Sequence, residues 1–222
     1  SQTGYGRTSS TSVAQETPRN LFGFKDGTNN IKSEDGDAKL NEHLWVQKGD
    51  DSGADWMAGG TYFVVRKIHM FAEMWDNLRL IEQEQTFGRD KRYGAPLNVT
   101  APTSGKDEFK PIDFKAKNKE GELEVPADSH IAIVNPEQNK GRWMLRRGYN
   151  YTEGSDALGR LSAGLFFIAF VRDPRTNFYP ILDKMTQKDA LSEYLQHQAR
   201  ALFAIPAGIG QSDTMVGQAL FS

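Results

Sequence analysis

The sequence predicts an α+β fold built on one antiparallel sheet, with its helices on one face. Two runs rich in β-branched and aromatic residues, 62–70 and 164–172, have the composition of strands. Apolar residues recur at helical intervals after the first run and again after the second. The expected order is strand, helix, two strands, helix, strand, which is the βαββαβ order of a ferredoxin-like unit.

The first strand and helix are expected between residues 62 and 83. Residues 62–70 read YFVVRKIHM, a composition that favours extended backbone. A helix is predicted over 71–83, where the apolar positions are Phe71, Met74, Trp75, Leu78 and Ile81. Residues 84–127 alternate turn-forming residues with charges, so we expect mostly irregular structure there.

The remaining elements follow after residue 142. Residues 143–151 (WMLRRGYNY) and 164–172 (GLFFIAFVR) are predicted strands, and the second of them is expected to be buried. Two helices are predicted over 177–184 and 188–200, and the apolar stripe of the latter includes Leu191, Tyr194, Leu195 and Ala199. A short last strand is expected over 202–205.

Composition divides the chain into two parts. Residues 1–60 are expected to form an N-terminal arm and a loop region, because 1–20 are polar and 31–60 mix acidic residues with glycines. Residues 61–222 hold all the predicted strands and helices, so they are expected to form the domain proper.

Charge and cysteine content exclude several classes of protein. The 222 residues carry a net charge of −2, which gives no electrostatic footprint for nucleic acid. No apolar run in the sequence is long enough to span a bilayer. The sequence has no cysteine, which excludes disulfides, thiolate catalysis and Cys-ligated zinc, haem or iron–sulfur clusters. A transition metal would therefore depend on the four histidines or on carboxylates.

Residues 21–30 (LFGFKDGTNN) hold one acidic residue between two glycines. Gly23 and Gly27 allow backbone conformations closed to other residues and let a flat ligand approach closely. Asp26 between them is a candidate for proton transfer. The alternative is an ordinary Asp-Gly turn with no catalytic role.

Among the histidines, His130 is the best placed to hold a cofactor. It lies between a polar turn and the apolar run 131–134, so one ring nitrogen could meet a cofactor while the other meets a carbonyl or carboxylate. A structural role is an equally good account of that position. His43 is expected to be solvated, His69 to be packed or at an edge of the first strand, and His197 to lie on the polar flank of the last helix.

Three segments, in the same order, resemble motifs of the dye-decolorizing (DyP-type) haem peroxidases. Residues 23–27 (GFKDG) are similar to the GxxDG signature of that family. Residues 128–132 (DSHIA) resemble the stretch that carries the proximal haem histidine, and 144–151 (MLRRGYNY) the strand that carries the distal arginine. The resemblance covers most of the chain and is greatest to the exported bacterial branch, which includes the deferrochelatase/peroxidases of iron-uptake operons.

The resemblance implies a peroxidase that uses haem b. It makes His130 the proximal ligand of the haem iron, Asp26 the acid–base group for hydrogen peroxide, and Arg146 its cationic partner, with Arg147 the less favoured choice. Further cofactor contacts are implied for Gly23, Gly27, His197 and Arg200. The candidates for electron relay, which are alternatively core aromatics, are Trp143, Tyr149 and Tyr151.

Members of this family are longer and have two ferredoxin-like domains, of which the chain matches the C-terminal one. We therefore expect the N-terminal half as a second chain, or a homo-oligomer, to cover an apolar sheet face fed by Phe166, Phe167, Ile168 and Phe170. The start at Ser1 instead of Met is what cleavage or truncation would leave. The resemblance also implies an extracytoplasmic or secreted protein without a membrane span.

Three functions remain open at this stage. The first is a peroxidase that takes hydrogen peroxide and oxidises dyes, phenolics or ferrous iron. The second is a deferrochelatase-like protein of an iron-uptake system, which releases iron from haem without peroxide. The third is a non-catalytic ferredoxin-like binding domain without a cofactor.

Overall fold

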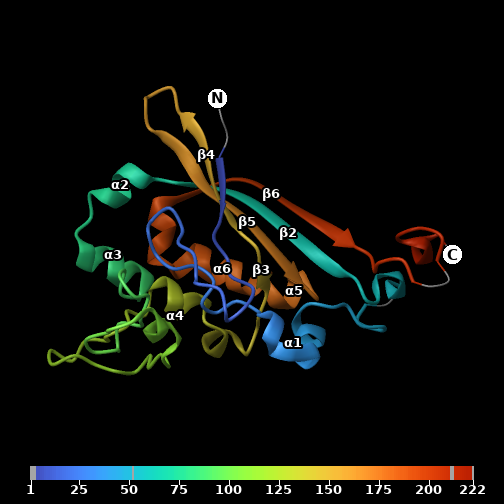
Figure 1. The fold of residues 1–222 in the computed structure, drawn as a ribbon, viewed down its shortest axis with the longest axis horizontal. Coiled ribbons are helices and arrows are strands. Elements are labelled where there is room, and N and C mark those ends of the chain that lie inside the picture. The colour runs from blue at the N-terminus through green and yellow to red at the C-terminus, as the bar shows by residue number, and fades with distance from the viewer. Residues whose placement is uncertain (1–3, 52, 211–212, 222) are drawn as a thin grey trace.

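The computed structural model describes residues 4–51, 53–210 and 213–221, and one antiparallel sheet organises them (Figure 1). Its strands are β1 (Gly4–Arg7), β2 (Thr61–Met70), β3 (Leu145–Arg146), β4 (Tyr149–Ser155), β5 (Leu161–Val171) and β6 (Leu195–Ile205). Their order is β1-β4-β5-β2-β6, and the short β3 also pairs with β5. The core order β4-β5-β2-β6 is that of a ferredoxin-like unit, so the predicted fold class is confirmed.

The helices lie mostly on one side of this sheet. They are α1 (Gly36–His43), α2 (Ala72–Asp76), α3 (Leu80–Phe87), α4 (His130–Val134), α5 (Pro174–Asn177) and α6 (Tyr179–Lys188). In Figure 1, α1 and α3 to α6 lie below the sheet, whereas α2 follows the end of β2. Among the described residues, none of these helices has the length and apolar character needed to cross a membrane.

Alternation along β2 gives the sheet two different faces. Val64, Ile68 and Met70 are buried toward the helices, where Val64 packs in a cluster with Phe178. On the opposite face, which we call the open face, Phe63 stacks on Phe170 with 5.0 Å between ring centroids. Aromatic side chains therefore gather on the face that carries no helix.

The four residues expected on one apolar face of β5 divide between both faces. Phe170 lies on the open face, and alternation places Phe166 and Ile168 there with it. Phe167 packs instead on the helix side, 6.2 Å from the ring of Phe178. The expectation for Phe167 was wrong because adjacent residues of a strand point to opposite faces.

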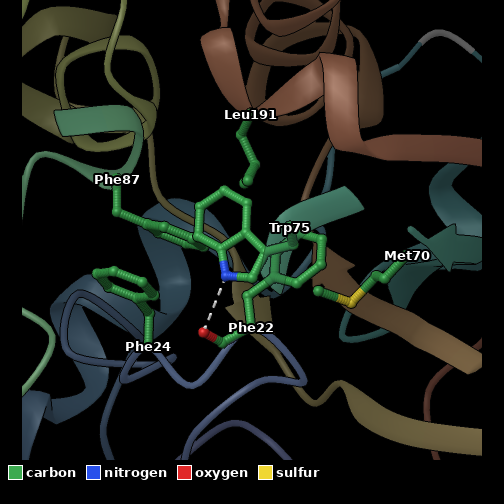
Figure 2. Close-up of a cluster of buried hydrophobic side chains, with 6 residues drawn as sticks. All are labelled: Phe22, Phe24, Met70, Trp75, Phe87 and Leu191. Carbon is green, nitrogen blue, oxygen red and sulfur yellow. Dashed lines mark hydrogen bonds between the residues drawn. The ribbon is translucent and has the colours of Figure 1, made fainter. Parts of the chain in front are cut away.

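A second buried cluster surrounds Trp75 (Figure 2). Trp75 stacks on Phe22 with 4.4 Å between centroids and meets Phe87 edge-on at 5.5 Å. Its indole Nε1 donates a hydrogen bond of 3.2 Å to the carbonyl of Phe22. Phe24 stacks on Phe87 at 4.1 Å, so α2 and α3 fix the apolar start of the GxxDG loop.

The predicted helix over 188–200 is wrong. A 3-10 helix, Ala190–Tyr194, is followed directly by strand β6, which begins at Leu195. Leu191 and Tyr194 belong to the 3-10 turn and Leu195 to the strand. These residues are three and four positions apart, as on one face of a helix, but they belong to two different elements.

The other predicted elements are present with shifted bounds. The helix over 71–83 is divided into α2 and α3, and the strand over 143–151 into β3 and β4 with a break at Gly148. Residues 84–127 are largely irregular, as expected, apart from the end of α3 and the 3-10 helix Gly105–Phe109. The N-terminal arm adds β1 at the edge of the sheet.

Candidate active site

A cavity opens between the helix side of the sheet, the GxxDG loop, α4 and α6. It encloses about 1400 Å³ of space that no protein atom fills, a figure that includes open solvent at its mouth. Much of the wall is apolar and includes Ile68, Met70, Leu165, Phe167, Ile181 and Met185. The ionisable side chains on the wall include Asp26, Arg66, Arg89, His130, Arg146 and His197.

Asp26 and Arg146 form an ion pair on this wall. The guanidinium Nη1 of Arg146 donates to Oδ1 of Asp26 over 2.5 Å, and the two side chains are 24% and 15% exposed. A partly buried pair of this kind is screened less by salt than a surface pair. The pair places a carboxylate beside a guanidinium group at the cavity.

Asn30 joins the loop that carries Asp26 to the strand that carries Arg146. Its side-chain Oδ1 accepts from the backbone N–H of Arg146 at 2.7 Å, and its Nδ2 donates to the Arg146 carbonyl at 2.9 Å. The carboxamide thus pairs with Arg146 as a neighbouring strand would. Asn30 is 2% exposed, so the link between the loop and β3 is shielded from water.

The two glycines of the GxxDG loop have different surroundings. Gly27 lines the cavity with a φ of +109°, and a Cβ at this position would lie 2.9 Å from the amide nitrogen of Ser10. Gly23 has a φ of +84° but is not among the described residues that line the cavity, and a Cβ there would meet Lys91. Both positions favour glycine, but only Gly27 lies on the wall.

His130 begins α4 and presents its ring to the same cavity. Its Nδ1 lies 2.7 Å from Oδ2 of Asp189, whose carboxylate is fully buried. The other oxygen of Asp189 accepts from the backbone N–H of Leu191 at 3.0 Å, so the carboxylate is itself fixed. With Nδ1 engaged, Nε2 is the ring nitrogen left to bind a ligand, and the carboxylate fixes the orientation of the ring.

A cluster of basic side chains lies on β2 and β6. Arg66 is 6% exposed, and its Nη2 lies 2.7 Å from Nε2 and 2.9 Å from Nδ1 of His197. Burial and the charge of Arg200 lower the pKa of Arg66 to about 10, while burial and Arg66 lower the pKa of His197 to about 4. Among the described residues no carboxylate pairs with Arg66, so its charge lacks a protein counter-ion.

A β-bulge brings His197 and Arg200 to the same face of the sheet. His197 pairs with Ile68 and Arg200 with Arg66, and the register shifts between these two pairs. Without the shift, residues three apart in a strand would face opposite sides. Arg200 therefore faces the helix side beside Arg66, although it is not among the described residues that line the cavity.

The remaining candidates have varied positions. Trp143 lines the cavity, and the ammonium of Lys39 lies 3.6 Å from its ring centroid. Tyr151 is 2% exposed, and burial raises the pKa of its phenol to about 12. His43 was expected to be solvated, but it is buried at 7% exposure against α5. His69 lies on β2 as expected, with its ring against Phe71.

The structure adds three side chains that the sequence did not identify: Asn30, Arg66 and Asp189. Asp189 lies 59 positions after His130, and Asn30 lies 116 positions before Arg146. The run Thr28-Asn29-Asn30 beside the GxxDG segment was a visible hint at a polar anchor. Nothing in the local sequence marked Arg66 or Asp189.

Comparison with known proteins identifies the family of this chain. The family model described as Dyp-type peroxidase, C-terminal, matches residues 17–210. The dye-decolorizing peroxidase of Thermobifida fusca is 38% identical over 86% of this chain and 43% of its own length. The deferrochelatase of Yersinia pseudotuberculosis is 36% identical over 94% of this chain and 46% of its own.

Solved structures give the same result. Ferric DtpA from Streptomyces lividans matches with a TM-score of 0.84 at 38% identity, covering 94% of this chain and 54% of that chain. DyPB from Rhodococcus jostii has a TM-score of 0.55 at 22% identity over 85% and 52%, a likeness of fold alone. The chain spans about half the length of these relatives, and it belongs to the Dyp-type peroxidase family, in the part that the family's C-terminal model describes.

Proposed function

We propose that this chain is the haem-binding part of a peroxidase that reduces hydrogen peroxide and oxidises dyes, phenolics or ferrous iron. The observation that carries the proposal is the presence, in one cavity, of an imidazole that contacts a buried carboxylate and of a separate carboxylate–guanidinium pair. An imidazole held in this way suits an iron ligand, and an acid–base group beside a fixed cation suits peroxide.

The residues of the cavity fit haem b. The apolar wall suits a flat macrocycle, and His130 Nε2 would hold the iron. The described residues contain no group of three or more histidine and carboxylate side chains able to bind a bare metal ion, which favours iron that arrives in a macrocycle. Arg66 is a buried cation with no carboxylate partner in the described part of the chain, and a propionate would supply one.

We assign the propionates to a basic group made of Arg66, His197 and Arg200. Nη2 of Arg66 lies within hydrogen-bond distance of both ring nitrogens of His197, so His197 would hold Arg66 in place, and the two arginines would supply the charge for the carboxylates. Gly27 would let the loop lie close to the macrocycle, and Gly23 would shape the loop from behind.

Haem, when bound, supplies the iron centre for peroxide reduction and the oxidising equivalents that substrates consume. Oδ1 of Asp26 is held by Arg146, which leaves Oδ2 to take a proton from hydrogen peroxide and return it to the departing oxygen as water. The Arg146 guanidinium stabilises the negative charge that develops as the O–O bond breaks. Asn30 fixes the backbone of Arg146 and so the direction of its guanidinium.

A second candidate function is release of iron from haem. It is favoured by the relatives named deferrochelatase, one of which is 36% identical over 94% of this chain. The same cavity would hold haem for that purpose, and His130 would again be the ligand. The two functions differ in their need for peroxide.

We also propose that the N-terminal half of the protein, as a second chain or the same one, or else a second copy, covers the open face. The chain spans about half the length of its relatives, and the open face carries Phe63, Phe170 and Phe203 in ring contact. An extracytoplasmic or secreted location is a further prediction, which cell fractionation would test.

The test begins with an absorption spectrum of the full-length protein after loading with haem. A ferric-imidazole spectrum that His130→Ala abolishes, with turnover of a dye only in the presence of peroxide, supports the peroxidase. Iron-free protoporphyrin formed without peroxide supports iron release instead. A protein that binds no haem, or a His130→Ala variant with an unchanged spectrum, contradicts the assignment.

A further inference from the structure

We propose that Glu108 is the positioning residue of the catalytic loop, because its buried carboxylate holds the chain on both sides of Asp26. This inference rests on the proposed peroxidase function, in which Asp26 moves the proton. It deepens that function by naming a residue that is not among the described residues lining the cavity.

Each oxygen of the Glu108 carboxylate has a different partner in the loop. Oε1 accepts from Nζ of Lys25 at 2.7 Å, and Oε2 accepts from Oγ1 of Thr28 at 2.6 Å. Glu108 is 3% exposed and the Lys25 side chain 4%, so the ion pair is shielded from water. Asp26 lies between the two residues that are held.

Glu108 is in turn fixed by its own surroundings. It belongs to the 3-10 helix Gly105–Phe109, which Ser104 caps and Asp107 closes with hydrogen bonds to the backbone. The carbonyl of Glu108 accepts from Nη1 of Arg89 at 2.9 Å, and the same Nη1 donates to the carbonyl of Gly94 at 2.6 Å. Arg89 is 6% exposed, so the support beneath the carboxylate is also buried.

Attachment at Lys25 and Thr28 restricts the backbone that sets the direction of the Asp26 side chain. The N–H of Asp26 donates to the carbonyl of Pro18 at 2.8 Å, which fixes a third point. Arg146 holds the end of the side chain, but Glu108 holds the chain from which it projects. A buried ion pair adds little to stability compared with an apolar pair of similar volume. Its position around a catalytic residue is therefore better explained by geometry.

The experiment compares Glu108→Gln with the matched control Glu120→Gln in the haem-loaded, full-length protein. Glu120 is an exposed acid of the same irregular region, and no hydrogen bond or ion pair of its side chain is found among the described residues. For Glu108→Gln we expect normal haem content and faster backbone amide exchange over residues 21–30. We also expect kcat/KM for hydrogen peroxide to fall on the order of 10- to 100-fold, the cost of a misplaced reacting group.

The same substitution in an Asp26→Asn background separates positioning from general support. If Glu108 acts through Asp26, Glu108→Gln should cause no further loss of kcat/KM once Asp26 is replaced. A further loss of the same size in that background would overturn the proposal, as would unchanged amide exchange in Glu108→Gln. Where Glu108→Gln fails to fold, Thr28→Val removes one attachment without exposing a charge and should give a smaller effect of the same kind.

Failure of the proposed function would have a different result. If Asp26→Asn itself leaves kcat/KM unchanged, Asp26 is not the acid–base group and the peroxidase mechanism is wrong. Faster amide exchange over 21–30 in Glu108→Gln would then still show that Glu108 holds this loop. Unchanged exchange would contradict that role of Glu108 as well.

Discussion

At the scale of single residues, the site depends on pairs that are distant in the chain. Asp26 and Arg146 are 120 positions apart, and His130 and Asp189 are 59 apart. In each pair one group does the proposed chemistry and the other fixes its direction or its charge. Removing Asp26 or Arg146 should therefore change the chemistry more than the binding of haem, whereas removing His130 removes the proposed ligand of the iron.

The first prediction concerns the pair on the peroxide side. Asp26→Asn and Arg146→Leu should each leave haem content nearly normal while slowing the reaction with hydrogen peroxide by about 10²–10⁴, the usual share of one positioned acid–base group. Arg147→Leu is the matched control, because Arg147 is exposed and its Nε contacts only the Tyr149 hydroxyl among the described residues. Stopped-flow mixing with peroxide measures the rates. If all three variants react with peroxide at the rate of the unchanged protein, neither Asp26 nor Arg146 takes part in the mechanism.

The second prediction concerns pH and His43. Burial lowers the pKa of His43 from its ordinary value of 6.5, so the folded chain stays neutral there at a pH where the unfolded chain already binds a proton. The free energy of unfolding should therefore fall as the pH drops below about 6.5, by at most about 1.4 kcal/mol per unit. Urea unfolding at pH 7.5, 6.5 and 5.5 measures this slope, and His43→Gln should make it shallower. An identical slope in that variant would exclude His43 as its source.

At the scale of elements, the sequence predicted the sheet better than the segment after α6. β2 and β5 are central strands rich in β-branched and aromatic residues, and their composition reflects burial on the helix side and contact on the open face. β6 is an edge strand with polar and apolar residues mixed, and a bulge interrupts its alternation. Local periodicity cannot indicate an interrupted strand, so the helical spacing misled the prediction.

The site shows the same division between local and distant information. The GxxDG loop, the histidine and the arginine each have a local motif, and the structure brings Asp26, His130 and Arg146 to one cavity. Arg66, Asn30, Glu108 and Asp189 have no such motif. Their roles depend on which strands pair and in which register, and a single sequence does not contain that information in a local form.

The third prediction tests the loop as an element. Gly27→Ala should destabilise the protein by more than Gly121→Ala, although both positions have positive φ. Backbone strain alone costs about 1–3 kcal/mol, and a Cβ at 121 meets nothing within 4 Å. At Gly27 the new Cβ must displace Ser10, which also moves Asp26 and should slow peroxide turnover. Thermal unfolding measures the loss of stability in the two variants, and steady-state kinetics measure their peroxide turnover. Equal losses in the two variants would contradict the steric argument.

At the scale of the whole molecule, the sheet has one complete side and one incomplete side. The helix side holds the cavity, and the open face carries a row of aromatic rings from β5 through β2 to β6. Phe203 is 50% exposed and Ile205 39%. Contiguous apolar surface of this kind usually marks an interface.

The fourth prediction follows from that surface. The well-folded protein should contain the N-terminal half of the relatives or a second copy of this chain, and Phe203→Glu should weaken the association at least tenfold. Leu158→Glu is the control, since Leu158 is 75% exposed in the turn between β4 and β5. Native mass spectrometry of the two variants would decide it. A 24.9 kDa monomer with stable haem and full activity would contradict the prediction.

The bulge in β6 changes which residues of this strand face the helix side of the sheet. Before Gln198, the odd-numbered residues Leu195 and His197 face the cavity, and after it the even-numbered Arg200 and Leu202 face the same way. Deletion of Gln198 would remove the bulge and restore regular alternation along β6. The side chains of one half of the strand would then point to the opposite face of the sheet. Either Leu195 and His197, or Arg200 and Leu202, would then leave the helix side. The proposed propionate-binding residues and the packing of Leu195 against the Trp75 cluster thus both depend on one extra residue in β6.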